Sequence, residues 1–359
     1  MKLNTFTQYL LIPLAAVALF GAGCGSTTTG PTGPDGGVWK STDKGTAWVN
    51  KRALVQGAKI TAGAASFNII DLVMDPQDRN TLYAATGDSG LAYSLDGGDS
   101  WQLYKIANIT KVNAVAVNPK DKCVIFVASA NKIYRTDNCG RDWKEVYFEP
   151  RSDVSFTHLA LDWFNPTVIY AGTSDGDILR SQDGGSYYEK IKRIDGVPIT
   201  SIVVDPHDSR SIYFGTRTDG IWKTADGGMT WTQIKKQFGD DLADGRRVIQ
   251  LVLDPVEANV IYDVCKYGIL KSTDGGEKWE ALNLTSPPGT VQINALAIDP
   301  KNNKNLIYTG VRTLQFSSDG GTSWAPKKLP TTQVGSVLLI DPQDSGVIYL
   351  GTTPPPQSN

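Results

Sequence analysis

Residues 94–101 read SLDGGDSW, and this Ser-x-Asp-x-Gly-x-x-Trp pattern, which we call a box, recurs with variations along the chain. Successive boxes start 53, 42, 45, 43, 48 and 45 residues apart. A nearly fixed period of this length is typical of propellers, solenoids and repeat arrays. The seven boxes begin at Ser41, Ser94, Thr136, Ser181, Thr224, Ser272 and Ser317.

Each box has the chemistry of a tight turn between two strands. Ser, Thr and Asp side-chain oxygens accept hydrogen bonds from nearby backbone N–H groups, and glycine adopts positive φ without a steric penalty. The Trp then supplies a large apolar anchor for the next strand. We therefore expect structural roles for one polar and one aromatic residue per box, namely Asp43 and Trp48, Asp96 and Trp101, Asn138 and Trp143, Asp183 and Tyr188, Asp226 and Trp231, Asp274 and Trp279, and Asp319 and Trp324.

A second repeated unit lies between the boxes. An apolar run ends at Asp-Pro or a variant, and an aromatic residue follows eight or nine positions later in a β-rich run. Because proline cannot donate to a β-ladder, it ends the first run as a strand. One unit therefore predicts four strands, of which the third enters the box and the fourth begins at its Trp. The first strands end at Asp75, Asn118, Asp162, Asp205, Asp254, Asp299 and Asp341.

The units and the boxes are out of phase. The box at Ser41 has no unit before it, and the last unit, which ends near Thr352, has no box after it. The two remainders complete one blade if the chain ends meet. This predicts an all-β fold, a seven-bladed β-propeller of four-stranded antiparallel blades with a composite N- and C-terminal blade. The longest irregular connections are expected at 50–68 and 235–247, on the face opposite the boxes.

Composition and charge limit the classes of partner. The chain has 359 residues, 36 Gly, 19 Pro and a formal net charge of −2. Many turn residues suit an all-β repeat protein, and a nearly neutral chain has no general attraction for nucleic acid. We expect a monomer with no nucleic-acid partner.

The first 23 residues have the features of a secretory signal. Lys2 precedes an apolar run over 9–20, and the sequence GAGC follows at 21–24. A basic start, an apolar core too short for a comfortable membrane span and small residues before a cut are typical of such signals. The segment resembles a bacterial lipoprotein signal, in which Cys24 becomes the lipidated first residue, with Gly21 where Leu is usual. An ordinary signal with a chance cysteine is the alternative.

This N-terminus predicts location and domain organisation. We expect a signal peptide over 1–23, a lipidated cysteine and flexible tether over 24–37, and the propeller over 38–359. The protein would then be exported and anchored by lipid to the bacterial cell envelope, at the outer membrane where the organism has one.

From about Val38 to the C-terminus, the chain resembles the Asp-box proteins, also called bacterial neuraminidase repeat proteins. The group includes sialidases, xyloglucan-cleaving hydrolases, sortilin receptor domains and photosystem II stability/assembly factors. Because the boxes are structural in all of them, the resemblance implies the fold and not one function. The arginine triad and Arg-Ile-Pro start of sialidases are not recognisable here. Xyloglucan-type hydrolases join two seven-bladed rings, whereas this chain has length for one.

Candidate catalytic acids should break the repeat rather than follow it. Glycosidases need two carboxylates roughly 5 to 10 Å apart across a cleft. If the chain is an enzyme, we expect a sialidase-like or xyloglucanase-like glycoside hydrolase with paired aspartates at the channel mouth. Solvated loop acids are the alternative interpretation. The candidates are Asp71, Asp88, Asp177 and Asp240, with Asp175, Asp241 and Asp244 as further departures from the repeat.

Candidate ligand-binding residues lie near the start of each inner strand and in the nearby connections. Such a polar ring of mixed charge could hold a sugar or a peptide terminus, and a water-filled funnel is the alternative. The inner-strand positions are Asp71, Asn113, His158, Ser201, Gln250, Asn294 and Ser336, and the connections add Asp88, Asp177, Arg217, Lys266 and Arg312.

The cysteines and histidines predict one disulfide and no metal site. Cys123 begins a second strand and Cys139 follows the third strand of the same blade, so the two should be neighbours and form a disulfide. Cys265 is expected to be buried as a small apolar residue. His158 and His207 lie in different repeats, and no zinc-like spacing is present. We expect neither a metal nor a cofactor.

The function expected from these features is non-catalytic. We expect a binding or assembly scaffold that holds a protein or a glycan through the face opposite the boxes. The glycoside hydrolase is the alternative, and a carbohydrate-binding protein without turnover is a third possibility.

Overall fold

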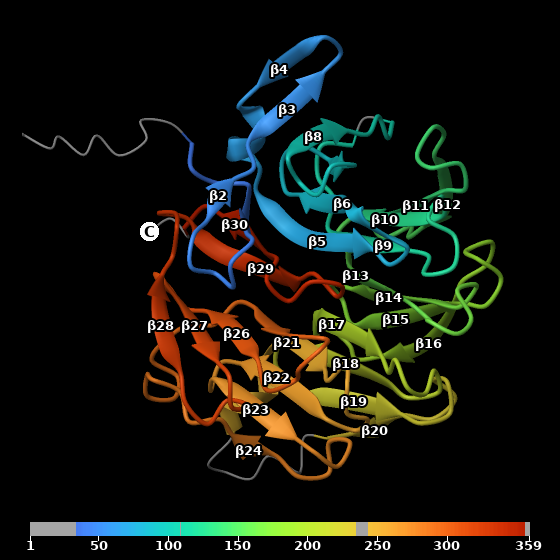
Figure 1. Cartoon of the computed structure of the whole chain (residues 1–359). Coiled ribbons are helices and arrows are strands. Elements are labelled where there is room, and N and C mark those ends of the chain that lie inside the picture. Colours follow the sequence, from blue (N-terminus) through green and yellow to red (C-terminus); the bar gives the residue numbers. More distant parts are fainter. Residues whose placement is uncertain (1–33, 108, 235–242, 356–359) are drawn as a thin grey trace, which may run out of the picture. The chain divides into compact units, whose positions relative to one another are not determined.

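Seven β-sheets stand around a common axis in the computed structural model (Figure 1). The structure describes residues 34–107, 109–234 and 243–355. The predicted signal peptide, Cys24, most of the predicted tether, Asp240 and Asp241 lie outside the described residues. No helix in the described ranges is long and apolar enough to cross a membrane. The seven-bladed propeller expected from the repeats is confirmed.

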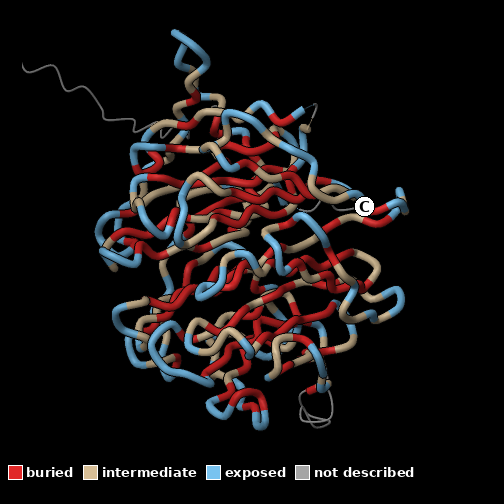
Figure 2. Tube along the Cα trace, turned by 90° about the vertical axis from the view of Figure 1, so that its right-hand side faces the viewer, coloured by how far each residue is buried: buried red, intermediate tan, exposed pale blue. Residues whose placement is uncertain are grey.

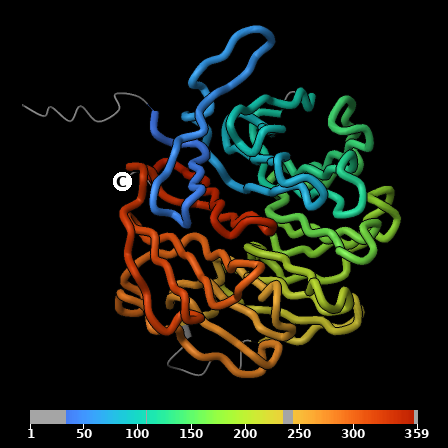
Figure 3. Tube along the Cα trace, viewed as in Figure 1, coloured from blue at the N-terminus to red at the C-terminus, as the bar shows by residue number. Residues whose placement is uncertain are grey.

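The closing sheet, which we call blade 1, joins the two ends of the described chain. Its strand order is β2-β1-β30-β29. In the pairing of β1 with β30, Val38 lies opposite Gly351 and Ser41 opposite Ile348. Figure 3 shows the blue start and the red end of the chain side by side at this blade. The strands are β1 (Val38–Ser41), β2 (Val49–Asn50), β29 (Val334–Ile340) and β30 (Ile348–Thr353).

Blades 2 to 7 follow in chain order, and each begins with its innermost strand. The first strands of neighbouring blades contact one another around the axis. Blade 2 holds β5 (Ile69–Asp75), β6 (Asp78–Thr86), β7 (Leu91–Ser94) and β8 (Ser100–Leu103), blade 3 holds β9 (Ala114–Val117), β10 (Ile125–Ser129), β11 (Lys132–Thr136) and β12 (Lys144–Phe148), and blade 4 holds β13 (Phe156–Leu161), β14 (Ile169–Thr173), β15 (Asp177–Ser181) and β16 (Glu189–Arg193). Blade 5 holds β17 (Ile199–Val204), β18 (Ile212–Thr216), β19 (Ile221–Thr224) and β20 (Thr232–Gln233), blade 6 holds β21 (Val248–Leu253), β22 (Ile261–Cys265), β23 (Ile269–Ser272) and β24 (Glu280–Ala281), and blade 7 holds β25 (Leu296–Ile298), β26 (Leu306–Thr309), β27 (Thr313–Ser317) and β28 (Ala325–Lys328).

The connection 50–68 is ordered rather than irregular, which corrects the sequence-based expectation. It forms a hairpin of β3 (Ala53–Gln56) and β4 (Lys59–Thr61), followed by the 3-10 helix η1 (Gly63–Ser66). Strand β3 pairs in parallel with β8, so blade 2 has two extra strands. The outer edge of β8 offers unpaired backbone groups, and β3 satisfies some of them. Figure 1 shows the hairpin projecting beyond the ring.

Buried apolar side chains fill the spaces between adjacent blades. Figure 2 shows the buried residues in red mainly in the interior of the trace and the exposed ones in pale blue mainly at the outer turns. Tyr213 and Ile221 of blade 5, for example, pack with Leu251 of blade 6. Burial of apolar surface is the main favourable term in folding, and here it acts between the sheets. Each blade is therefore stabilised by its two neighbours.

The boxes form the turns between the third and fourth strands. In the box of blade 2, the Ser94 hydroxyl donates to Asp96 at 2.7 Å and accepts from the Gly98 N–H at 2.8 Å. Gly98 has a φ of 87°, which glycine adopts without strain, and the Trp101 side chain is fully buried. The bond from the N–H of the glycine four residues after the Ser or Thr to that hydroxyl oxygen is present in all seven boxes.

Long cationic side chains tie each of four box turns to the preceding blade. They lie on third strands and donate to a box carbonyl of the next blade, which satisfies a backbone acceptor that the turn leaves open. We call the boxes together with these contacts the outer rim. The contacts are Lys40 to Gly97 at 2.8 Å, Arg135 to Gly184 at 3.1 Å, Arg180 to Gly227 at 2.5 Å and Lys223 to Gly275 at 2.9 Å.

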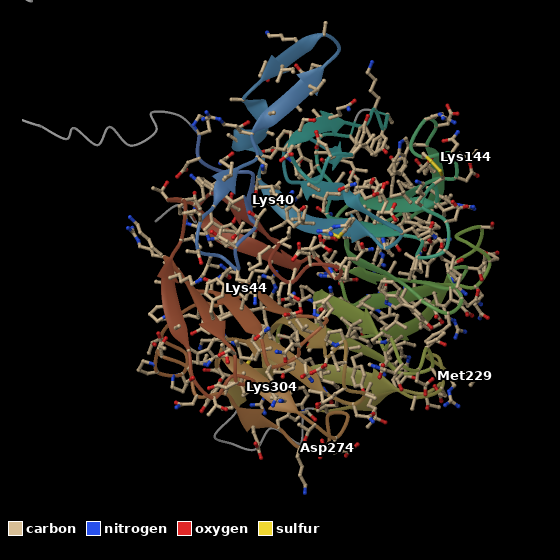
Figure 4. All side chains as sticks on the ribbon, in the orientation of Figure 1. Lys40, Lys44, Lys144, Met229, Asp274 and Lys304 are labelled. Atoms are coloured by element: carbon tan, nitrogen blue, oxygen red, sulfur yellow. A yellow bond between two sulfur atoms is a disulfide. The ribbon has the colours of Figure 1, made fainter. Side chains whose placement is uncertain are left out.

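A disulfide joins Cys123 to Cys139, as the spacing predicts. It appears as the yellow bond beside Lys144 in Figure 4. The Cys139 N–H also donates to the Cys123 carbonyl at 3.1 Å. The bond therefore fastens the box turn of blade 3 to the connection before β10. Cys265 is buried and lies outside this disulfide.

Candidate functional site

The face of the ring that carries the box turns is called the box face below, and the opposite face is the loop face. Inner strands start on the loop face, where the polar residues predicted to bind a ligand lie. Six of these seven side chains bond to the backbone of the next blade. We call this set of contacts the inner ring. Asn113, Asn294 and Ser336 donate to Phe156, Gly335 and Ile69 at 2.8, 3.2 and 2.7 Å, while Asp71, Ser201 and Gln250 accept from the N–H groups of Val115, Leu251 and Leu296 at 3.2, 3.1 and 2.9 Å.

The seventh position, His158, makes no such bond. Its Nδ1 is buried and has no hydrogen-bond partner. Burial lowers the pKa of the imidazole to about 4, so the ring is neutral at pH 7. His158 therefore leaves one hydrogen-bonding atom of the inner ring unused, at the edge of a cavity.

That cavity has a volume of about 660 Å³ and opens on the loop face between blades 4, 5 and 6. Three of its lining residues carry positive charge, and none of the described lining residues is Asp or Glu. We call it the cationic mouth. It is lined by Thr157, His158, Ile199, Thr200, Arg217, Thr218, Arg247, Val248, Ile249, Lys266 and Gln292.

Backbone hydrogen bonds hold the three cations at the mouth. The Arg217 N–H donates to the Pro198 carbonyl at 3.0 Å, which fixes the β18–β19 connection beside β17. The Lys266 N–H donates to the Arg247 carbonyl at 3.2 Å, which brings two cations together. Arg247 follows the 3-10 helix η3 (Ala243–Arg246) and precedes β21. The site is thus built from loops on rigid inner strands.

The mouth has little negative charge to offset these cations within the described ranges. The Lys266 ammonium lies 3.3 Å from Asp244, and both side chains are about half exposed. Such exposed pairs contribute little to stability and remain open to solvent. Arg217 and Arg247 are exposed and have no ion pair with a described residue. An anionic ligand would find a preformed positive field here.

A second, smaller cavity adjoins the cationic mouth. It has a volume of about 330 Å³ and shares Gln292 with the first. Two of the predicted ligand residues, Asn294 and Ser336, line it. Ser201 and Gln250 line neither cavity, and Arg312 is exposed outside both.

Asp177, a predicted catalytic acid, is the centre of a charge network. Its fully buried carboxylate accepts from Arg151 at 2.5 Å, from Lys190 at 2.9 Å and from Arg193 at 2.9 Å. Burial alone would raise its pKa, but the hydrogen bonds from these three cations outweigh burial and lower it. Asp175 is held by the same two arginines. A carboxylate kept ionised in this way is poorly suited to act as a general acid.

The other predicted acids are not brought together. Burial raises the pKa of Asp71 to about 6, but its carboxylate accepts from the Val115 N–H in the inner ring. Asp88 is exposed and accepts from the Ser89 hydroxyl. Asp244 pairs with Lys266, and Asp240 and Asp241 fall outside the described residues. None of the described candidates lines the cationic mouth.

Of the residues that the sequence predicts to bind a ligand, the structure places His158, Arg217 and Lys266 at the cationic mouth. Sequence reasoning noted Arg247 only as part of a long connection and did not identify Thr157, Thr200 or Gln292. The available signal for Arg247 was its position directly before an inner strand, on the face opposite the boxes.

Comparisons with known proteins place the chain among propellers. A family model described as "Sortilin, neurotensin receptor 3" matches residues 36–169, and no curated protein matches the chain. The xyloglucanase GH74 from Xanthomonas campestris is similar in structure, with 19% identity and a TM-score of 0.65, over 80% of this chain and 51% of that one. The chain thus spans about half the length of the xyloglucanase.

Two further solved structures are similar over nearly their whole length. YCF48 bound to a D1 peptide has 16% identity and a TM-score of 0.62, over 82% of this chain and 94% of that one. YCF48 from Cyanidioschyzon merolae has 15% identity and a TM-score of 0.60, over 79% and 95%. At these identities the likeness establishes the fold alone.

Proposed function

We propose that the chain is a non-catalytic scaffold that holds an acidic segment of a partner protein at the cationic mouth. The observation that carries this proposal is the convergence of Arg217, Arg247 and Lys266 on one cavity whose described lining has no carboxylate. Arginine forks recognise carboxylates in two-point contacts, and Lys266 adds a point charge. The neutral His158 ring beneath them can donate or accept a hydrogen bond.

A peptide suits the mouth better than a neutral glycan. Neutral sugars gain nothing from an excess of positive charge, whereas acidic side chains or a C-terminal carboxylate do. The YCF48 structure, which this chain resembles over most of its length, is a propeller bound to a peptide, and this supports the choice. We further propose that the scaffold is exported and anchored through Cys24, as the N-terminal sequence predicts.

The alternative is a glycoside hydrolase. It is favoured by the likeness to half of a xyloglucanase and by the raised pKa of Asp71. Hydrolysis needs a second carboxylate across a cleft. Asp177, the most buried candidate, is instead neutralised by three cations. The binding scaffold therefore accounts for more of the observed geometry.

The test compares an acidic fluorescent peptide with its uncharged amide counterpart on the full chain, by fluorescence anisotropy. We expect the acidic peptide alone to bind. Changing both Arg217 and Arg247 to Gln should weaken peptide binding by roughly tenfold or more, because each hydrogen bond to a charged group contributes about 1.5–3 kcal/mol. Arg312→Gln is the matched control, since this arginine is exposed and lines neither cavity.

Three outcomes decide between the proposals. Equal binding of both peptides, or equal effects of the double variant and of Arg312→Gln, would contradict the cationic mouth. Cleavage of xyloglucan or of sialylated glycans by the wild-type chain, lost in Asp71→Asn, would establish the hydrolase instead.

A further inference from the structure

A third cavity lies toward the other end of the channel, where the inner strands approach the box face. It has a volume of about 400 Å³ and is lined by β5, β9, β13, β17 and β21 with the residues that follow them. Every lining residue is Val, Ala, Leu, Ile, Met, Pro or Trp. We call it the apolar chamber. The indole N–H of Trp163 is the one side-chain group in this lining that can hydrogen-bond, and no lining side chain carries a charge.

One residue of the chamber breaks the repeat. In six units a proline follows the residue that ends the inner strand, whereas Trp163 follows Asp162. The turn does not require this change, because Asp162 still accepts from the N–H two positions ahead at 2.7 Å, as Asp75 does at 2.8 Å. The Trp163 side chain lines the chamber with 48% of its surface exposed. A large indole exposed at the rim of an apolar cavity is typical of a binding site.

The chamber and the cationic mouth follow one another along the same three strands. On β13, His158 lines the mouth and the next residue, Leu159, lines the chamber. Along β17 and β21, too, the earlier residues line the mouth and the later residues line the chamber. With a rise of about 3.3 Å per residue, Thr157 to Leu161 spans roughly 13 Å. The inner strands therefore run from positive charge at the loop face, past the inner-ring residues Ser201 and Gln250, to an apolar wall toward the box face, and we call this the channel path. No described residue lines both cavities.

We propose that this path binds a carboxylate with a single unbranched acyl chain, its head group at Arg217 and Arg247 and its tail in the apolar chamber. Charge complementarity sets the direction of the ligand, since only the mouth can pair with the carboxylate. The chamber volume lies within the range of about 300–1,000 Å³ usual for small-ligand sites. The inference rests on the anion-binding mouth proposed above and adds a class of ligand that a peptide site does not require.

Isothermal titration of the full chain with acetate, octanoate and laurate, and with the uncharged alcohol dodecanol, tests this. We expect affinity to rise about fourfold for each methylene that enters the chamber, since burying one contributes about 0.8 kcal/mol. Dodecanol should bind at least tenfold more weakly than laurate, because it has no charge for the mouth. Changing Arg217 and Arg247 to Gln should weaken all carboxylates by a similar factor.

Variants at the chamber distinguish the contribution of the acyl tail to affinity from that of the carboxylate head group. Ala160→Phe, which fills the chamber wall, should reduce laurate to the affinity of acetate, with the melting temperature as a check on folding. Trp163→Ser should weaken laurate by about fivefold and leave acetate unchanged. Phe164→Ser is the matched control, because this neighbouring aromatic residue is 54% exposed but does not line the chamber.

Each result has a definite meaning. Rising affinity with chain length that is lost in Ala160→Phe and kept in Phe164→Ser supports the proposal. Equal binding of acetate and laurate overturns it while leaving the cationic mouth intact. Equal binding of laurate and dodecanol, or no binding of any of the four probes, also overturns it. Loss of acidic-peptide binding in the arginine variant is measured separately and reports only on the mouth.

Discussion

The outer rim and the inner ring both join neighbouring blades by hydrogen bonds, but they do so with opposite sequence requirements. The rim repeats nearly the same residues in all seven boxes. The ring uses Asp, Asn, Ser or Gln at equivalent places, and at His158 it has no bond. A box must fold its own turn, which requires a hydroxyl, a carboxylate or amide oxygen, and a glycine at fixed positions. A ring position needs only one donor or one acceptor, because the next blade presents both N–H and C=O groups.

This difference shows which structural positions can be recognised from repetition in the sequence. Repetition marks positions whose chemistry is fixed locally, within one turn. Positions whose partner is a backbone group of another blade can vary without any loss of the contact. Variable polar residues near a channel are therefore not by themselves a sign of ligand binding.

The largest effect on the free energy of unfolding is expected at the outer rim. Trp101→Ala should lower the free energy of unfolding by about 3–5 kcal/mol, because it empties a fully buried site between blades. Trp163→Ala, at the half-exposed indole of the box face, should change it by no more than about 0.5 kcal/mol. Urea denaturation measures both. Similar values for the two variants would remove the distinction between anchoring and exposed indoles.

A smaller, pH-dependent effect on the free energy of unfolding is expected inside blade 6, between the outer rim and the inner ring. Asp263 on β22 is fully buried, and neither carboxyl oxygen has a hydrogen-bond partner. Burial raises its pKa well above the usual value, so the folded protein holds the proton. Stability from this group is fully present below the unfolded pKa of about 3.9 and is lost as pH rises toward the folded pKa.

Asp263→Asn should therefore become more stable than the wild type as pH rises, by about 1–3 kcal/mol near neutral pH. Urea denaturation at pH 4 and pH 7 measures the difference between the two proteins at each pH. A difference that stays constant between these values would show that the Asp263 carboxyl is not neutral in the fold.

The smallest effect is expected at the inner ring. Ser336→Ala removes the bond to Ile69 that closes the ring and should cost about 1 kcal/mol. The control is Ser66→Ala, which removes an equally short hydroxyl bond at an exposed position and should cost less. Thermal melting of both variants tests this order. An Ser336→Ala protein as stable as the wild type would show that the ring contacts contribute nothing individually.

The sequence was sufficient for the fold because the boxes act locally. The period, the turn chemistry and the out-of-phase ends together predict seven blades and the pairing of β1 with β30. It was sufficient for the disulfide for the same reason, since Cys123 lies just before β10 and Cys139 just after β11, at neighbouring ends of two paired strands. The hairpin β3–β4 escaped prediction because its partner, β8, lies nearly fifty residues ahead on the edge of blade 2.

The candidate site could be predicted only in part. Residue spacing places His158, Arg217 and Lys266 on the loop face. It does not indicate that these side chains line one cavity together with Arg247. The neutralisation of Asp177 depends on Arg151 from the preceding connection and on Lys190 and Arg193 from the neighbouring strand. The role of Asp71 depends on a backbone N–H of blade 3. These partners are set by tertiary packing, which residue spacing does not encode.

Blade 1 has a consequence for how the protein is made. A ribosome releases β1 early, yet its partner β30 begins only at Ile348, after the strands of blades 2 to 7. Blades 2 to 7 can assemble in order as they emerge, since each is continuous in the chain and N-terminal units fold first. The strand β1 must wait for β30, so blade 1 forms only after the other six blades have been made. A nascent chain that stops before β30 would keep an open, adhesive edge at both ends.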